Sequence, residues 1–396
     1  MNSVGSVKNK NVLLLQGPMG SFFKKLDKLL KQNGATTYKI GFNAGDSFFS
    51  NHYNYIPYRD TKENYRAFIA KFLEEKKIDV IFLFGDCRYY QSISIQEAKA
   101  LNIKVFVFEE GYIRPHYITM EKYGVNDFST ISRSADFYKK IQLSKEPEAV
   151  DTKNSQFKMI ISAILYYLSA NIFSFRYPHY EHHRDFSAVK EAFFGLRSLF
   201  RKLTYPFYEK KYLPKIKNEL SDKYFFVPLQ TYNDFQILTH SPYDSIEMFI
   251  VEVLDSFAKY ARDDFLIFKH HPVDRGRKNY KKFISQEAKR LNVEKRVLIL
   301  FDTHLPTLLK NAKGTITINS TVGLSSLYHN TPTITLGNAI YDIEGLTCKG
   351  MKLEDFWHNQ KEVDRELLQK YRLYLIKHTQ LNGSFYGKFP SINFDD

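Results

Sequence analysis

Apolar positions in the first part of the chain alternate between short continuous runs and longer segments with helical spacing. The continuous runs predict buried strands and span residues 11–15, 36–42, 80–84 and 104–108. The helical segments between them span residues 22–33, 64–76 and 92–101. This alternation predicts a parallel, doubly wound sheet. The turn after the first strand carries Gly17 and Gly20 but lacks the full G-x-G-x-x-G pattern, so it is weak evidence for a bound dinucleotide.

The second part of the chain repeats the alternation. Its apolar runs span residues 224–229, 265–268, 297–301, 314–318 and 332–336. Segments with helical spacing lie between them at residues 243–260, 305–311 and 324–329. The sequence therefore predicts an α/β protein with two Rossmann-like domains facing each other across a cleft, which is the GT-B-like arrangement.

We expect three parts along the chain. Residues 1–205 form an N-terminal Rossmann-like domain, and residues 206–360 form a C-terminal Rossmann-like domain that binds the donor. Residues 361–396 form a helical tail that we expect to pack back on the first domain.

A change in composition marks residues 155–185. Residues 159–175 are largely apolar, and a basic and aromatic flank that includes Arg176 follows them. The run is too short and too rich in Ser and Asn to span a membrane comfortably. Two interpretations stay open: a buried helix between the domains, or an interfacial helix with its apolar face in lipid and its flank at the headgroups.

Composition narrows the class of partner. The net charge is +14 and the pI is about 9.3, so we expect an anionic partner. The charge is spread over short lysine pairs, which argues against a dedicated nucleic-acid binder. Two distant cysteines and an N-terminus without the layout of a signal peptide predict a cytoplasmic protein. Since no Cys or carboxylate stands at ligand spacing with His179, His182, His183 and His240, we expect no metal and no cofactor.

Polar side chains follow two neighbouring strands of the second domain. Gln230 and Asp234 come after the run 224–229, and a second group follows the run 265–268, namely Lys269, His270, His271 and Pro272. Ligands of parallel α/β sheets bind beyond the carboxyl ends of the strands. These residues therefore predict two walls of one site, with ordinary loop polarity as the alternative.

Two further groups have candidate chemistry. Glu109, Glu110 and Gly111 end the strand 104–108; one carboxylate can face a cleft as a general acid or base, or both can lie on a solvated loop edge. Gly111 would let the backbone pass close to a ligand, and Arg114 suits a carboxylate or phosphate. A strand-to-helix turn holds Asn319, Ser320 and Thr321, which predicts a phosphate cradle or simple helix capping.

Seven motifs follow one another along the chain: residues 15–18 (LQGP), 42–46 (FNAGD), 108–115 (FEEGYIRP), 227–230 (VPLQ) with Asp234, 269–272 (KHHP) with 274–276 (DRG), 319–321 (NST) and 382–386 (NGSFY). Together they resemble bacterial capsule polysaccharide biosynthesis and export proteins of the KpsS type, over nearly the whole chain. The resemblance implies a retaining β-Kdo glycosyltransferase that uses CMP-Kdo without a metal. It also implies a lysophosphatidylglycerol acceptor at the inner face of the cytoplasmic membrane, and other capsule biosynthesis proteins as partners.

The resemblance also implies roles for the candidate residues. Retention requires two inversions or a single-face route; in the first case Asp234 would attack the anomeric carbon and form a covalent intermediate. Glu109 or Glu110 would deprotonate the acceptor hydroxyl, and His271 would stabilise the departing CMP. The expected donor-binding residues are Gln230, Lys269, His270, Pro272, Asn319, Ser320, Thr321, Arg114 and Gly111. The expected acceptor-binding residues are Gln16, Gly17, Asp46 and Arg176. The alternative functions are a non-catalytic protein that carries the lipid-linked glycan to an exporter, or a nucleic-acid binder.

Overall fold

The computed structural model describes residues 3–181, 188–232 and 235–395, and the chain divides into two compact units. Unit 1 comprises residues 1–130, 144–188 and 373–396, and unit 2 comprises residues 131–143 and 189–372. The expected boundary at 205/206 falls inside helix α7 (Ala188–Glu209), because the polar face of that helix is hydrogen-bonded to loops of unit 2. Of the expected tail, residues 373–396 belong to unit 1.

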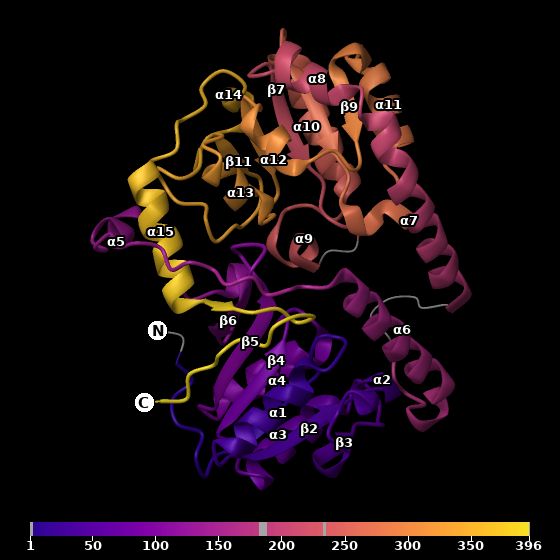
Figure 1. Cartoon of the computed structure of the whole chain (residues 1–396), viewed down its shortest axis with the longest axis vertical. Coiled ribbons are helices and arrows are strands. Elements are labelled where there is room, and N and C mark those ends of the chain that lie inside the picture. Colours follow the sequence, from indigo (N-terminus) through magenta and orange to yellow (C-terminus); the bar gives the residue numbers. More distant parts are fainter. Residues whose placement is uncertain (1–2, 182–187, 233–234, 396) are drawn as a thin grey trace. The chain divides into compact units, whose positions relative to one another are not determined.

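Unit 1 is built on a seven-stranded sheet in the order β12-β6-β5-β4-β1-β2-β3 (Figure 1). Its strands are β1 (Asn11–Leu14), β2 (Thr36–Gly41), β3 (Tyr55–Pro57), β4 (Val80–Phe84), β5 (Lys104–Glu110), β6 (Tyr117–Lys122) and β12 (Gln380–Asn382). The strands β1 to β5 pair in parallel, whereas β6 pairs antiparallel with β5 and with β12. The order reverses at β1, as it does in Rossmann-like sheets.

Helices cover both faces of this sheet. Side chains of a strand alternate between faces, so Leu13 enters one apolar cluster while Val12 and Leu14 enter the other. The helices of unit 1 are α1 (Phe22–Gln32), α2 (Ala44–Phe48), α3 (Tyr65–Glu75), α4 (Tyr89–Ala100) and α6 (Gln156–Ile172), with 3-10 turns at His52–Asn54, Asn126–Phe128 and Ser174–Arg176. The buried face of α1 includes Phe22 and Leu26, at the spacing that predicted the helix.

Unit 2 is built on a five-stranded, fully parallel sheet in the order β11-β10-β7-β8-β9. Its strands are β7 (Tyr224–Pro228), β8 (Phe265–Lys269), β9 (Val297–Leu300), β10 (Gly314–Thr317) and β11 (Thr333–Thr335). The register sets Pro228 opposite Lys269 and Lys269 opposite Leu300. Because all five strands run the same way, the loops that follow β10, β7, β8 and β9 lie along one edge.

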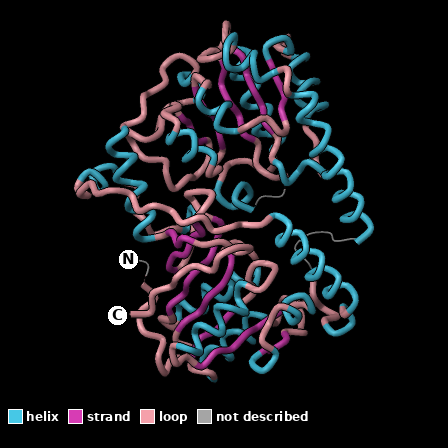
Figure 2. The backbone as a smooth tube through the Cα atoms, in the orientation of Figure 1, coloured by secondary structure: helices cyan, strands magenta, loops and turns pink. Residues whose placement is uncertain are grey.

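The helices of unit 2 are α5 (Ala135–Lys139), α7, α8 (Tyr212–Pro214), α9 (Phe235–His240), α10 (Ile246–Tyr260), α11 (Lys281–Arg290), α12 (Leu305–Lys310), α13 (Val322–Tyr328), α14 (Leu353–Phe356) and α15 (Arg365–His378), with a π-helical turn at Lys215–Glu219 and 3-10 turns at Pro272–Gly276 and Glu294–Arg296. The division between the units falls within α15, at residues 372/373. Helix α7 is the long helix labelled at the right of Figure 1, and Figure 2 shows the same view with the helices in cyan.

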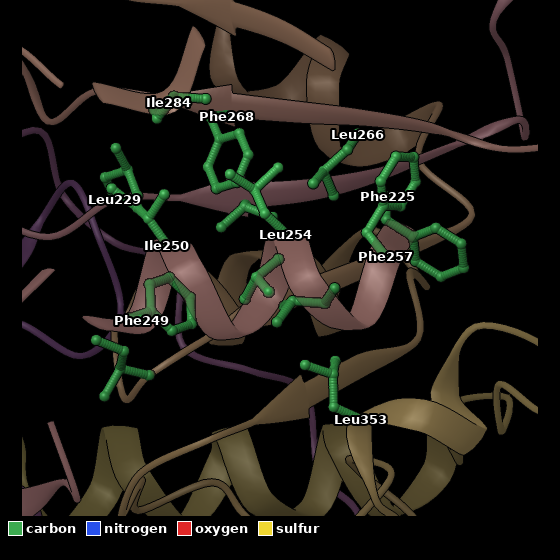
Figure 3. Packing of buried hydrophobic residues seen from close by; sticks show 14 of the residues in the cluster. Phe225, Leu229, Phe249, Ile250, Leu254, Phe257, Leu266, Phe268, Ile284 and Leu353 are labelled. Atoms are coloured by element: carbon green, nitrogen blue, oxygen red, sulfur yellow. The ribbon is translucent and has the colours of Figure 1, made fainter. Parts of the chain in front are cut away.

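The main core of unit 2 lies between α10 and the sheet (Figure 3). Leu254 and Phe257 of α10 belong to the same buried cluster as Phe225, Leu266 and Phe268 of the strands. A second cluster includes the alternate strand residues, among them Phe226 and Ile267. The prediction of two α/β domains is therefore confirmed, although the sheet predicted as parallel in unit 1 ends in the antiparallel strands β6 and β12. Each sheet is buried on both faces, as continuous apolar strands require.

Candidate functional site

Glu109 and Glu110 end β5, and their environments differ. Glu110 is exposed, whereas Glu109 is half-buried and accepts a hydrogen bond at its Oε1 from the Glu110 backbone N–H, at 3.0 Å. Desolvation, helped by the negative charges of Glu110 and Asp86, raises the pKa of Glu109 to about 7, while the hydrogen bond from the Glu110 N–H and the charge of Arg88 oppose this shift. A carboxyl group with this pKa is suited to accept a proton near neutral pH.

The turn after these carboxylates is held by the protein itself. A Cβ on Gly111 would lie 2.1 Å from the backbone oxygen of Tyr117, so the close approach that requires glycine here is to the chain's own backbone. The exposed Arg114 donates from Nε to the Gly111 oxygen at 3.2 Å. Gln380 of β12 accepts from the backbone N–H groups of residues 112 and 113, at 3.0 and 3.3 Å.

Two of the expected acceptor-binding residues, Gln16 and Asp46, are buried in one hydrogen-bond network. Gln16 Nε2 donates to Asp46 Oδ2 at 3.2 Å and to the Tyr166 hydroxyl at 3.0 Å. Tyr166 donates to Asp46 Oδ1 at 3.0 Å, and the Phe42 N–H donates to Oδ2 at 2.9 Å. Since Tyr166 is the buried residue of α6, the network fastens α6 to the first strands of the sheet. The structure thus gives Gln16 and Asp46 a structural role.

Gly17 and Arg176 lie in different surroundings. A Cβ on Gly17 would lie 2.6 Å from the Phe23 ring, so glycine is needed there for packing. Arg176 is exposed, and its guanidinium lies 5.2 Å from the centre of the Phe173 ring. Together with Phe48 and His52 it lines a cavity of about 180 Å³ at the end of α6.

Helix α6 exposes most of its apolar side chains. Phe157 is 71% exposed and Ile172 is 63% exposed, and other large apolar residues between them are exposed as well, namely Met159, Ile160, Ile161, Ile164, Leu165 and Leu168. This exposure favours the interfacial interpretation over a buried helix. Among the residues that the structure describes, no helix has both the length and the apolar character needed to cross a bilayer.

At the end of β8, Lys269 and His270 are buried, whereas His271 is more accessible. Lys269 is buried and donates from Nζ to the Phe301 oxygen at 3.0 Å; desolvation lowers its pKa, while Asp302 and Glu209 oppose that shift. His270 is buried, its Nε2 accepts from the Tyr280 N–H at 2.8 Å, and desolvation lowers its pKa to about 4. His270 is therefore a neutral structural histidine.

His271 is the more accessible member of this run. It is half-buried, and its Nδ1 accepts from the Val273 N–H at 3.2 Å at the start of the 3-10 turn Pro272–Gly276. With Nδ1 as acceptor, a neutral ring carries its hydrogen on Nε2 and can donate from there. Pro272 is exposed and opens the turn.

Hydrogen bonds tie together the loops at the carboxyl ends of the unit 2 strands. Arg275 donates from Nε to Asp302 Oδ2 at 2.8 Å, which joins the loops after β8 and β9. Gln230 Nε2 donates to Asn319 Oδ1 at 3.0 Å, and the Asn319 N–H donates back to Gln230 Oε1 at 3.3 Å, which joins the loops after β7 and β10. The expected donor-binding residues of this unit therefore lie along one edge of the sheet.

One side-chain hydrogen bond closes the turn before α13. Ser320 Oγ accepts from the Val322 N–H at 3.2 Å, and the half-buried Thr321 precedes the first residue of the helix. Thr321 is the N-cap residue and makes no side-chain capping hydrogen bond, so the phosphate cradle stays a prediction. The expected nucleophile Asp234 lies outside the described residues, as do His182 and His183.

Sequence reasoning missed Glu209, the last residue of α7. Its carboxylate accepts from the Phe301 N–H at 2.6 Å, the Asp302 N–H at 2.9 Å, and both the N–H and the hydroxyl of Thr303 at 2.7 Å. The same helix holds the loop after β8 through Arg197, which donates to the oxygens of residues 276 and 277 at 2.6 and 3.0 Å. The signal was their helical spacing, which sets Arg197, Arg201 and Glu209 on one face.

Within residues 3–181, 188–232 and 235–395, no three or more His, Cys, Asp or Glu side chains are placed together to hold a metal ion. Lys269 and Arg275 place positive charge near the strand ends of unit 2.

Known proteins resemble the chain over nearly all of its length. A sequence model of the family described as "Capsule polysaccharide biosynthesis protein" matches residues 79–386. The capsule polysaccharide export protein KpsS of Escherichia coli is 39% identical over 96% of this chain and 98% of its own length. The capsule polysaccharide modification protein LipB of Neisseria meningitidis (Z2491) is 36% identical over 98% of this chain and 94% of its own length. The solved β-Kdo 2,7 transferase of KpsC from Thermosulfurimonas dismutans is 15% identical, covers 92% of this chain and 89% of its own, and has a TM-score of 0.43.

Proposed function

The chain belongs to the capsule polysaccharide biosynthesis protein family, and from this premise we propose that it is a glycosyltransferase of capsule assembly. It transfers Kdo from CMP-Kdo, with retention, to a phosphatidylglycerol or lysophosphatidylglycerol acceptor. The product is the start of the poly-Kdo linker of a capsular polysaccharide.

The observation that carries this proposal is the position of Glu109 at the carboxyl end of β5, which pairs in parallel with β4. The raised pKa of about 7 supports it, because a general base must be able to gain and lose a proton near neutral pH. We assign Glu109 as the base that takes the proton of the acceptor hydroxyl, with Glu110 as the neighbour that tunes it.

The donor binds at the strand ends of unit 2. CMP-Kdo carries one phosphate and one sugar carboxylate, and anionic groups are bound best by charged or N–H donors. His271 donates from Nε2 to the phosphate, and protein side chains rather than a metal ion balance its charge. Lys269 and His270 are already engaged inside the protein, so they support the loop and do not contact the donor directly.

Retention follows from two displacements. The Asp234 carboxylate attacks the anomeric carbon of Kdo, the bond to the phosphate oxygen breaks, and CMP leaves with the bonding electrons. The acceptor hydroxyl then attacks the same carbon, gives its proton to Glu109 and displaces Asp234. The role of Asp234 rests on its sequence position alone.

The acceptor reaches unit 1 from a lipid surface. The exposed apolar side chains of α6 enter the interfacial region, and Arg176 at the end of the helix meets anionic headgroups. The protein is thus a peripheral enzyme on the cytoplasmic face of the inner membrane.

The test is a transfer assay with pure protein. CMP-Kdo and a fluorescent lysophosphatidylglycerol are incubated with the protein and with its Glu109→Gln variant, and the lipid is analysed by mass spectrometry. Addition of Kdo to the lipid by the unaltered protein alone supports the proposal. Binding of a Kdo-bearing lipid without any transfer from CMP-Kdo would favour the second candidate, a non-catalytic carrier of the lipid-linked glycan, which the name of the E. coli relative as an export protein suggests.

A further inference from the structure

We propose that α7 is a docking helix by which unit 2 binds an anionic lipid surface. The inference goes beyond the proposed function, because it concerns a helix outside the transfer chemistry and holds whatever sugar is transferred. It rests on three observations: an exposed apolar stripe, a polar opposite face that is hydrogen-bonded to unit 2, and an excess of positive over negative charge.

The outer side of α7 carries a continuous apolar stripe. Its residues recur every three or four positions, which places them on one side of the helix. They are Phe193 (57% exposed), Leu196 (70%), Phe200 (68%), Leu203 (62%) and Phe207 (82%). Monomeric proteins rarely leave so many large apolar side chains exposed in one contiguous row, so the stripe marks a surface that another phase or molecule covers.

The opposite side of α7 is fixed to unit 2 by polar contacts. Arg197 donates to two backbone oxygens of the loop after β8, and Arg201 donates to the Arg275 oxygen at 2.7 Å. Tyr205 packs on Phe301 with ring centres 4.4 Å apart, and Glu209 accepts the N–H groups after β9. The helix therefore cannot rotate to bury its stripe against unit 2 without breaking these contacts.

The charge of the helix and of the segment after it identifies the partner. Five exposed lysines lie on the helix away from the stripe or on the segment that follows it: Lys202, Lys210, Lys211, Lys215 and Lys217. Between residues 193 and 217 the sequence has one acidic residue, Glu209, and that side chain is buried among backbone N–H groups. A helix with an apolar face of Phe and Leu and with cations on its other side is typical of helices that lie in a lipid interface.

A second copy of the chain fits the same surface less well. The spacing of three and four residues also suits a helix pair, but coiled coils match opposite charges beside the seam. Two copies of α7 would bring together two segments of the same positive charge with no exposed acidic residue between residues 193 and 217 to match it, whereas an anionic bilayer offers the complementary charge.

The test is vesicle flotation with the full chain. The vesicles are phosphatidylcholine alone or phosphatidylcholine mixed with phosphatidylglycerol. One variant combines Leu196→Ser with Leu203→Ser, and the matched control combines Met248→Ser with Tyr328→Ser, which are exposed apolar residues elsewhere on unit 2. We expect the α7 variant to bind mixed vesicles at least tenfold more weakly, the control to bind like the unaltered protein, and both to keep its thermal unfolding midpoint.

A second variant tests the charge. Replacing Lys202, Lys210 and Lys211 by Gln should weaken binding to the mixed vesicles by about fivefold for each lysine and should make it less sensitive to salt. It should leave the weaker binding to pure phosphatidylcholine unchanged.

Three results would overturn the inference. The first is unaltered flotation of the α7 variants. The second is a lower unfolding midpoint of the Leu196/Leu203 variant, because it would show that the stripe is covered in the folded protein. The third is a dimer that these changes convert to a monomer without any effect on flotation. CMP-Kdo hydrolysis is measured alongside, so that failure of lipid docking and failure of the proposed transfer are separate outcomes.

Discussion

Replacing Glu109 by Gln should reduce transfer by a factor of about 10² to 10⁴, which is the usual contribution of a positioned general base. The structure also predicts the pH profile that the unaltered protein follows. Burial raises the pKa of Glu109 from 4.5 to about 7, a difference equivalent to about 3 kcal/mol in favour of the protonated form. A base must be deprotonated to act, so kcat/KM should rise with pH and level off above about 7. About one pH unit below that pKa, roughly one tenth of the carboxyl groups are ionised, and the rate should be about tenfold lower.

Glu110→Gln is the matched control, because Glu110 is adjacent, exposed and of the same chemical type. Its negative charge helps to raise the pKa of Glu109. Removing that charge should move the rise of kcat/KM to lower pH and leave the plateau nearly unchanged. Arg88 and Asp86 also act on the pKa of Glu109, and both are unchanged in the Glu110→Gln variant.

The assay is the initial rate of lipid glycosylation between pH 5 and 9, at saturating CMP-Kdo and a lipid concentration well below its KM, so that kcat/KM for the lipid acceptor is measured. Folding is checked by circular dichroism. The reasoning is refuted if Glu109→Gln keeps the rate of the unaltered protein. It is also refuted if Glu110→Gln is the inactive variant, because the exposed carboxylate would then be the base.

Three further predictions concern both units. His271→Ala should weaken CMP binding measured by calorimetry by about 1.5–3 kcal/mol, because a charge-assisted hydrogen bond to phosphate is lost; unchanged affinity would exclude that role. Glu209→Ala should lower the free energy of unfolding in urea by about 3 kcal/mol, because three backbone N–H groups lose their acceptor, with Glu209→Gln as the milder control; equal stability of all three proteins would contradict this. Burial raises the pKa of Glu121 from 4.5 to about 7, so between these pH values the folded state keeps a proton that the unfolded state releases. The free energy of unfolding should therefore fall as the pH rises from about 4.5 to 7, and Glu121→Gln should reduce this pH dependence. Denaturant titrations at several pH values check both expectations.

The fold was predictable because its strands are buried on both faces. A strand such as 224–229 must be apolar at every position, and such runs stand out between polar turns and amphipathic helices. The short strands β3 and β12 were not predicted, because three residues carry no period and neither strand lies within a predicted apolar run, as β11 does in the run 332–336. β12 also pairs with β6, more than 250 positions earlier in the chain, and a local sequence pattern cannot predict such a contact.

The site was predictable to the level of loops but not of side chains. The rule that ligands gather at strand ends selects residues 109–111 and 269–272 together. It cannot say that Lys269 and His270 turn inward while His271 stays accessible, because that depends on Phe301 and Tyr280 from other loops. Gln16 and Asp46 were predicted as binding residues because they are polar. Their hydrogen-bond partner Tyr166 lies in a largely apolar helix far away in the sequence, so their contact could not be predicted.

The pairing of β12 with β6 has a consequence for the order in which the chain is synthesised. Residues 380–382 complete the edge of the first sheet, and Gln380 holds the turn that follows Glu109 and Glu110. A ribosome makes all of unit 2 before it reaches these residues. The sheet edge of unit 1 therefore stays open while unit 2 is synthesised, and the candidate catalytic carboxylates gain their final support only after all of unit 2 has been made. Nascent chains that stop before residue 380 should contain a folded unit 2 beside an unfinished and inactive unit 1.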